Sequence, residues 1–505
     1  MLGAIAEAAF VLYSAILVVL AALAAHRAWL AFRVLRAGPS AFVPAPTPDR
    51  GWPRVLVQLP VYNERFAVEG LLEAVAAFDY PRSRLCIQIL DDSTDETVTV
   101  VARAALSLRD RGHEVQHLRR PTRDGFKAGA LAYGLSAAPG AELIAIFDAD
   151  FRPGPRFLAE AVGALERDPQ VGMVQARWGH QNRAHSALTE AQALLLDAHF
   201  RLEHRGRDLA GHAFNFNGTA GVWRRRAIEE AGGWSARTLT EDLDLSYRAQ
   251  LAGWRFLYRD DLEVPSELPE RIEAFRAQQG RWARGGVETA RALVPTILGA
   301  RHWSIGKRLE ALAHLLGNAA PLGLALLGLL LPLAVYARIL TPSTLAAALD
   351  LGSLGLGSLA ILWFYSVAAA LSDRERSPKL ILSALVLGAG VSVSAGLEAL
   401  LALLGHRVDF ARTPKRAQAE PGLAAQTYPI DRTWFPLLLE LAAGLYHLSA
   451  LGLALWSGAY GAAPFFSMYA GGALWMGVGA LLEKRRAPRR YPLPGPLLTS
   501  GRRGG

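Results

Sequence analysis

Two carboxylates spaced two residues apart, Asp148 and Asp150, directly follow the apolar run 143–147. If that run is a strand, both carboxylates can turn onto one hard cation. Mg²⁺ or Mn²⁺ bound there would hold a diphosphate and neutralise its charge as it leaves. Because turns are rich in aspartate, the pair alone is weak evidence for such a site.

A second acidic pair, Asp91 and Asp92, follows the apolar run 85–90. A carboxylate at the end of a strand can accept hydrogen bonds from a nucleobase or a ribose. The same segment can begin a helix instead, because Ser93 and Glu96 have the spacing of a capping box. The residues alone leave both interpretations open.

Two later segments could complete a group transfer. In Thr240-Glu241-Asp242, Asp242 could act as a general base, since a helix N-terminus keeps it ionised until it takes a proton. The alternative is an ordinary helix start with a threonine cap. In the segment 278–282, a basic residue could pair with a diphosphate and a Trp face could carry a sugar ring. Taken alone, that segment is more simply an interfacial Arg and Trp beside a membrane span.

Short apolar strands alternate with helical stretches between residues 54 and 300, where no run is long enough to cross a membrane. This alternation predicts an α/β fold with a mostly parallel sheet, whose ligands bind at the carboxyl ends of the strands. Strands are expected at 54–59, 85–90, 114–118, 142–147 and 171–177. The acidic pairs therefore lie at the edge of the sheet where ligands bind.

Long apolar runs flank this domain, and 51% of all residues are hydrophobic while 20% are charged. About 20 apolar residues cross a bilayer, so the chain is expected to combine membrane spans with a water-facing domain. The run 4–25 predicts an N-terminal anchor over 1–36, and the basic residues after it place the next segment in the cytoplasm. Further spans are expected at 312–336, 351–371, 380–404, 434–456 and 463–482.

The distribution of charge constrains the topology. The basic segment 405–432 and the basic tail 484–505 should both be cytoplasmic, which conflicts with three simple spans before residue 405. We therefore expect 380–404 to be interfacial or re-entrant, with 396–405 as a short surface helix. The net charge of +9 fits this bias and an anionic lipid surface better than nucleic acid. The single cysteine, Cys86, excludes a disulfide framework and a cysteine metal site.

In their order along the chain, these motifs resemble the D, D, D, Q-x-x-R-W pattern of family 2 glycosyltransferases. The segments 57–64, 125–131, 174–178 and 215–224 resemble its cellulose synthase-like branch, above all the β-mannan and β-glucan synthases. The resemblance implies a GT-A type, Rossmann-like domain over 54–300 and a multi-span α-helical region over 307–483. Within 405–432, the segment 410–415 resembles the gating loop of cellulose synthases, carried here by Phe410, Thr413 and Lys415.

The resemblance also implies roles for individual residues. Glu241 and Asp242 would be the catalytic residues, with Asp242 as the base. The nucleotide sugar would be bound by Asp91, Asp92, Lys127, Asp148, Gln278 and Arg281. The acceptor would be bound by Trp282, Asn217, Gly218 and Thr219. Asp148 and Asp150 would hold Mg²⁺ or Mn²⁺.

The implied activity is inverting, metal-dependent transfer of a hexose from UDP-glucose or GDP-mannose to the end of a growing β-linked polysaccharide. The chain would export its product across a bacterial-type plasma membrane, with its catalytic domain in the cytoplasm and with accessory export subunits as candidate partners. One alternative is a non-processive glycolipid synthase similar to ceramide glucosyltransferase. Another is a transporter or receptor, which the few ionisable residues of the C-terminal apolar runs disfavour.

Overall fold

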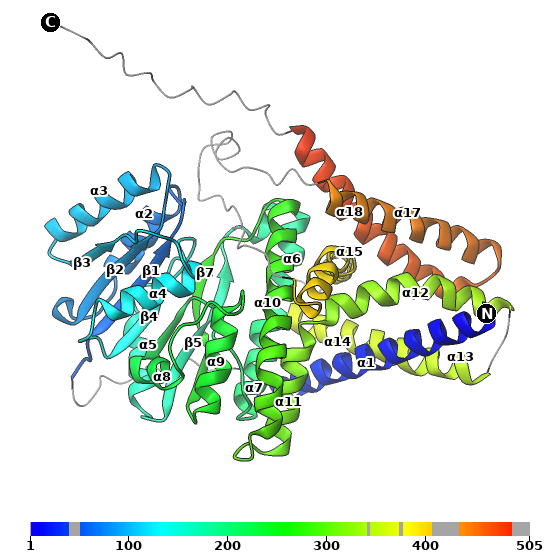
Figure 1. The fold of residues 1–505 in the computed structure, drawn as a ribbon, viewed down its shortest axis with the longest axis horizontal. Helices are drawn as coiled ribbons and strands as arrows, with labels where there is room; N and C mark the ends of the chain where they lie inside the picture. Colours follow the sequence, from blue (N-terminus) through cyan, green and yellow to red (C-terminus); the bar gives the residue numbers. More distant parts are fainter. Residues whose placement is uncertain (1, 40–50, 341–343, 373–376, 407–433, 487–505) are drawn as a thin grey trace, which may run out of the picture.

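The computed structural model describes residues 2–39, 51–340, 344–372, 377–406 and 434–486 (Figure 1). A sheet-containing domain lies at one end of the molecule and a bundle of long helices at the other. The expected gating residues Phe410, Thr413 and Lys415 lie outside the described residues, as do 487–505 of the basic tail.

The domain is built on one seven-stranded sheet in the order β3-β2-β1-β4-β6-β5-β7. Strands β1 to β4 run parallel where they pair, β6 is antiparallel to β4 and β5, and β5 is parallel to β7. The strands are β1 (Val55–Val61), β2 (Leu85–Asp91), β3 (Glu114–Leu118), β4 (Leu143–Ile146), β5 (Val171–His180), β6 (Gly221–Arg224) and β7 (Arg255–Ser266). The predicted mostly parallel α/β fold is confirmed.

Two of these strands were not expected from the sequence. β6 has only four residues, too few for an apolar pattern to stand out. β7 carries Arg259, Asp260 and Asp261 in its middle, which interrupt its apolar pattern. Both strands are fixed by pairing with β4 and β5 rather than by local sequence.

Helices cover both faces of the sheet. One layer consists of α2 (Val68–Ala76), α3 (Thr97–Asp110) and α5 (Phe157–Glu166), and the other of α4 (Phe126–Ser136), α8 (Arg225–Glu230) and α9 (Glu241–Leu251). Successive residues of β1 enter opposite layers, since Val55 and Val57 pack with the first and Leu56 with the second. The buried apolar sheet thus provides a rigid base for the loops at its carboxyl edge.

A continuous helical stretch joins this domain to the bundle. α6 (Ala187–Ala198) passes through one π-helical segment, η3 (His199–His204), into α7 (Arg205–Leu209). Such π segments inside α-helices are often found at functional sites. α10 (Ile272–Gly299) packs against α9, α11 (Ile305–Gly317), α15 (Pro378–Leu403) and α18 (Ala463–Arg486). The remaining short segments that the structure describes are three 3₁₀-helices, η1 (Arg82–Arg84), η2 (Arg183–His185) and η5 (Tyr460–Ala462), and a second π-helical segment, η4 (Leu351–Gly355).

The bundle consists of α1 (Leu2–Ala37), α12 (Ala320–Leu340), α13 (Thr344–Asp350), α14 (Leu356–Leu371), α15 (Pro378–Leu403), α17 (Phe435–Trp456) and α18 (Ala463–Arg486). Within the described residues, six helical segments are long and apolar enough to cross a membrane: 9–37, 320–339, 348–371, 378–403, 435–456 and 460–485. These segments mark the chain as a membrane protein.

The helix α15 differs from the expectation for its sequence. It is one continuous helix to Leu403, so the expected separate surface helix at 396–405 is wrong. Ala395, Ala399 and Ala402 are buried in it against α10 and α12. Figure 1 draws α15 nearly end-on, whereas α1, α12, α17 and α18 run across the picture. An interfacial position for α15 stays a prediction, since its length and apolar composition also suit a span.

Candidate active site

The carboxyl edge of β4 holds an ion pair between Lys127 and Asp148. Lys127 lies near the start of α4, and its Nζ is 2.6 Å from Asp148 Oδ1. The same ammonium donates to the carbonyl oxygen of Gly218 at 2.9 Å. The backbone N–H of Asp148 donates to Thr219 Oγ1 at 2.9 Å. Lys127, Asp148, Gly218 and Thr219, which lie far apart in the sequence, therefore meet at one point.

Asp242 joins this point from the first turn of α9. Its Oδ1 accepts the backbone N–H of Leu243 at 2.8 Å. A Cβ placed on Gly218 would lie only 2.9 Å from Asp242 Oδ2 and 3.4 Å from Lys127 Nζ. Gly218 also has a φ of +79°, which L side chains rarely adopt. Glycine is thus the residue that allows the loop to approach Asp242 this closely.

The site carries more negative than positive charge. Asp148, Glu241 and Asp242 all act electrostatically on the single ammonium of Lys127. Burial raises the pKa of Glu241 and of Asp242, and the charge of Asp242 raises that of Glu241 further, although Lys127 opposes both shifts. Burial would lower the pKa of Lys127, but Asp148 and Glu241 raise it overall. A carboxylate with a raised pKa is a better proton acceptor near neutral pH.

Asp148 offers hard oxygen ligands at this negatively charged point, and the buried Asp150 follows it two residues later in the chain. Within the described parts of the chain, no group of three or more His, Cys, Asp or Glu side chains is placed to hold a metal ion. A divalent cation would therefore need water or phosphate oxygens to complete its shell, which is how Mg²⁺ usually binds. The donor chemistry and the surplus negative charge both fit such an ion.

One face of α10 closes the site. Thr240 Oγ1 lies 3.1 Å from Thr289 Oγ1, and the backbone N–H of Leu239 donates to Glu288 Oε2 at 2.9 Å. A Cβ on Gly285 would lie 2.6 Å from Thr240 Cγ2, so helix and loop are in close contact. Thr240 precedes α9 without capping it through its side chain, so the interpretation as a simple threonine cap is wrong.

The motif residues of α10 share this face. Gln278, Arg281 and Trp282 precede Gly285 by seven, four and three residues, which places all four on one side of a helix. Gln278, Arg281 and Trp282 are half-buried, and Gly285 is buried. The structure therefore sets the Q-x-x-R-W motif on the side of α10 that faces Thr240 and the start of α9.

The two aspartates at the end of β2 are held by neighbouring side chains. Asp91 is buried and lies 3.0 Å from His117 Nε2, and it accepts the backbone N–H of Ser93 at 2.9 Å. Burial opposes ionisation, but these hydrogen bonds lower the pKa of Asp91 below its ordinary value. Ser93 Oγ accepts the backbone N–H of Asn63 and caps no helix, so the capping-box interpretation is wrong.

Asp92 forms a two-pronged ion pair with Arg120, whose Nε lies 3.0 Å from Asp92 Oδ1. Arg120 also donates to the carbonyl oxygens of Asp124 at 2.7 Å and Phe126 at 3.0 Å. These contacts hold the turn that presents Lys127. Arg120 was not singled out from the sequence, because its ion-pair partner Asp92 lies 28 residues away along the chain.

Comparison with known proteins adds to this geometry. Residues 53–285 match the family model described as "Glycosyltransferase like family 2". The chain carries a family 2 glycosyltransferase domain. A solved mannosyltransferase from Pyrobaculum calidifontis, PcManGT in complex with GDP-Man and Mn²⁺, is 25% identical with a TM-score of 0.50, over 72% of this chain and 100% of that one.

The family 2 domain also has curated plant relatives. It is 44% identical over 250 residues to probable glucomannan 4-beta-mannosyltransferase 3 of Oryza sativa subsp. japonica, covering 49% of this chain and 45% of the relative. Glucomannan 4-beta-mannosyltransferase 2 of Arabidopsis thaliana is also 44% identical over 250 residues, covering 49% of this chain and 47% of the relative. The match thus spans just under half of each relative's length.

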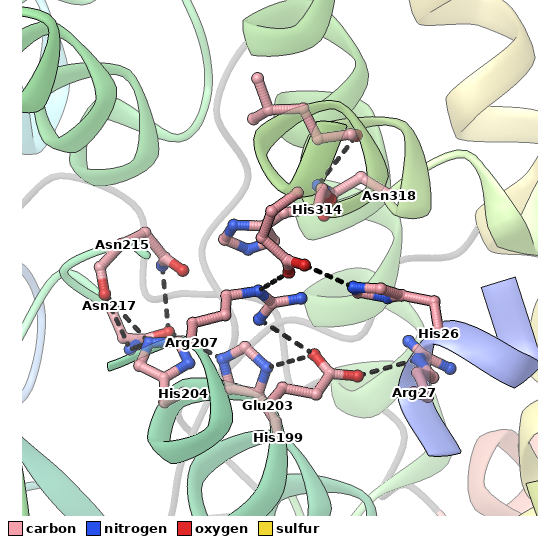
Figure 2. Close-up of polar contacts among 12 residues, drawn as sticks. His26, Arg27, His199, Glu203, His204, Arg207, Asn215, Asn217, His314 and Asn318 are labelled. Atoms are coloured by element: carbon pink, nitrogen blue, oxygen red, sulfur yellow. Dashed lines mark hydrogen bonds and ion pairs between the residues drawn. The ribbon is translucent and has the colours of Figure 1, made fainter. Parts of the chain in front are cut away.

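On its membrane side, the family 2 domain places Asn217 in contact with two histidines of η3. Asn217 Oδ1 lies 3.1 Å from His199 Nε2, and Asn217 Nδ2 lies 2.8 Å from His204 Nε2 (Figure 2). His204 is fully buried, and burial lowers its pKa well below the ordinary value, so it is neutral. These histidines were missed in the sequence, although they lie six and one residues before Arg205 on one helical stretch.

Proposed function

We propose that the chain is an inverting mannosyltransferase that uses GDP-mannose and extends a β-linked glycan at a membrane surface. The contact between Asp242 and the Gly218 loop, beside the Lys127–Asp148 ion pair, is the observation that carries this proposal. It places a proton acceptor and a cationic group within one small site. The plant relatives named as mannosyltransferases and the archaeal enzyme solved with GDP-Man support mannose over glucose.

The reaction would proceed as a single displacement. The acceptor hydroxyl attacks the anomeric carbon of mannose, and its proton passes to a carboxylate oxygen of Asp242. The bond from the anomeric carbon to the diphosphate oxygen breaks on the opposite face, and GDP leaves. Attack from the face opposite the α-linked diphosphate gives a β-linkage.

Charge stabilisation on the leaving side would come from side chains already in place. Lys127, paired with Asp148, would lie beside the donor, and Arg281 lies on the face of α10 that closes the site. A divalent cation held by Asp148 and Asp150 would neutralise the diphosphate when bound. Asp92 would act through Arg120, by fixing the turn that carries Lys127, and Asp91 would line the nucleotide side of the same edge.

The helical bundle would hold the product side of the enzyme. Trp282, together with Asn217, Gly218 and Thr219, would contact the acceptor. A catalytic domain in the cytoplasm, a processive reaction and export of the glycan are parts of the same proposal. They are supported by six candidate spans around the domain and by the resemblance of 410–415 to a gating loop.

The test is a transfer assay with purified protein in lipid vesicles. Radiolabelled GDP-mannose and UDP-glucose are supplied separately, each with Mg²⁺ or Mn²⁺ and a short β-1,4-linked mannose oligosaccharide as acceptor. We expect incorporation from GDP-mannose into a product that an endo-β-mannanase degrades. No incorporation from either donor by the wild type, under conditions where the protein is folded, would refute the proposal.

A further inference from the structure

A cavity of about 560 Å³ lies inside the helical bundle, and its two ends differ in chemistry. Most of its wall comes from aliphatic side chains of α1, α12, α14 and α15, such as Leu20, Leu327, Ile361 and Leu385. Its other end is lined by the polar residues His26, Arg27, His199, Glu203, Arg207 and His314. The volume lies in the range of ordinary small-molecule sites.

The polar end adjoins the active site. His199 lines the cavity and contacts Asn217, which directly precedes Gly218, the residue against Asp242. On the other side, His314 lines the cavity, and its Nδ1 lies 2.8 Å from the hydroxyl of Tyr247. Tyr247 and Asp242 both belong to α9. A molecule filling the cavity would therefore bring its polar end next to the proposed acceptor position.

The charges at the polar end balance. Arg27 Nε lies 2.8 Å from Glu203 Oε1, and Arg207 Nε lies 2.9 Å from Glu310 Oε1 (Figure 2). His26 contacts the same Glu310 at 2.7 Å. With two arginines against two glutamates, this end has no surplus positive charge for a phosphate. An uncharged polar group suits it better.

The cationic side chains at this end are already paired, since Arg207 is buried and its Nη1 lies 3.5 Å from Glu203 Oε2. The aliphatic wall offers a sugar chain few partners, and each unsatisfied hydroxyl would cost free energy. A hydrocarbon chain is stabilised by the same wall.

We propose that this cavity binds a lipid with an uncharged, hydroxyl-bearing head group, and that the lipid serves as the first acceptor. The hydrocarbon chain lies in the aliphatic part, and the head group lies between His199, Arg207 and His314. Its hydroxyl oxygen attacks the anomeric carbon of the donor, the proton passes to Asp242, and the nucleoside diphosphate leaves. The inference rests on the proposed function for the transfer step, but not for the binding of lipid.

The test uses a photoreactive diacylglycerol, with photoreactive phosphatidic acid as the anionic comparison, and the full chain in detergent. Cross-linked peptides are mapped by mass spectrometry. Gly388 lies in the cavity wall on α15, and a Cβ there meets nothing within 4 Å, so Gly388→Leu fills the cavity without a clash at its base. Gly452 on α17 is equally open and does not line the cavity, so Gly452→Leu is the matched control.

We expect the diacylglycerol to label peptides of α1, α12 or α15 in the wild type, and phosphatidic acid to label them much less. Gly388→Leu should reduce the labelling roughly tenfold, and Gly452→Leu should not change it. In the transfer assay, Gly388→Leu should lose lipid-linked product but still extend an added mannose oligosaccharide.

Three results would overturn the inference: no labelling of cavity peptides in the wild type, equal labelling by the anionic lipid, or an oligosaccharide recovered from the cavity in place of lipid. The labelling of the wild type decides the matter even if Gly388→Leu does not fold. A wild type that binds diacylglycerol but transfers no sugar would refute the proposed function and leave the binding site standing.

Discussion

Two groups of charged side chains lie on either side of Asn217, and they differ in charge balance. At the active site, Asp148, Glu241 and Asp242 surround one lysine, which leaves a surplus of negative charge. At the polar end of the cavity, two arginines, Arg27 and Arg207, pair with two glutamates, Glu203 and Glu310. The negative charge of the first group must be neutralised by a cation or by protons. The charges of the second group neutralise one another.

This difference distinguishes a site suited to catalysis from a site that stabilises the fold. Surplus negative charge raises the pKa of a carboxylate, so that the carboxylate accepts a proton more readily. A balanced network instead holds elements together, here α1, η3, α7 and α11, which meet through His26, Glu203, Arg207 and Glu310. Catalysis should therefore depend on the first group and the integrity of the fold on the second.

The largest effect should come from removing the proton acceptor. Asp242→Asn keeps the shape of the side chain but cannot take a proton, so the rate of transfer should fall by about 10²- to 10⁴-fold. Binding of GDP-mannose should stay nearly unchanged in an equilibrium binding assay. Glu229→Gln is the control, because Glu229 pairs with Arg225 on the exposed surface of α8. A variant that retains its full rate would exclude Asp242 as the base.

A second effect should appear in the response to metal. Asp148→Asn removes one carboxylate from the proposed cation site and also releases Lys127. We expect the Mn²⁺ concentration that gives half-maximal transfer to rise by about 10- to 100-fold, as in sites that lose a supporting contact. A chelator should abolish transfer by the wild type, and added Mn²⁺ should restore it. Transfer that is unaffected by the chelator would contradict the assignment of a cation to this site.

The placement of several candidate-site residues could be predicted from the sequence, because these residues follow local patterns. The strands β1 to β5 are short apolar runs, and the carboxyl ends of parallel strands must share one edge. Asp148 and Asp91 could be placed there on that ground alone. Gly285 and Thr289 escaped notice, although they continue the face of α10 that Gln278 and Trp282 begin.

The balanced network could not be predicted. His26 and Glu310 lie 284 residues apart, and Arg207 and Glu310 lie 103 apart, with no shared motif. Their meeting depends on how α1 and α11 pack against α7, which hydrophobic periodicity does not specify. From the sequence, a charged residue near an apolar run only indicates on which side of the membrane its segment lies. In the folded protein these residues meet in one buried network.

A third prediction concerns the stability of that network. Glu203 pairs with Arg27 and lies near Arg207, and its side chain is 9% exposed. Glu203→Gln should leave Arg27, whose side chain is 37% exposed, without its partner and Arg207 with Glu310 alone, and should cost about 1–3 kcal/mol of folding free energy. The loss would be seen as a lower melting temperature in detergent, followed by tryptophan fluorescence. Glu73→Gln breaks the exposed pair with Arg111 and should cost less than about 1 kcal/mol. Equal effects of the two variants would show that the network contributes no more than a surface pair.

The smallest expected effect is a gain in folding stability. Glu241→Gln removes one of the surplus carboxylates at the candidate active site, so it should stabilise the fold at pH 8. Glu203→Gln, by contrast, should destabilise it. The pKa of Glu241 is raised in the folded protein, mainly by burial and then by Asp242. As the pH rises, the unfolded state therefore releases this proton at a lower pH than the folded state does. The folding stability then falls as the pH rises from the ordinary glutamate pKa near 4 through the raised pKa of the folded state. The wild-type melting temperature should drop over this interval, and Glu241→Gln should reduce the drop. If the stability of Glu241→Gln depends on pH as that of the wild type does, a cation or Lys127 already neutralises the carboxylate. The two charged groups would then not differ in how they affect folding stability.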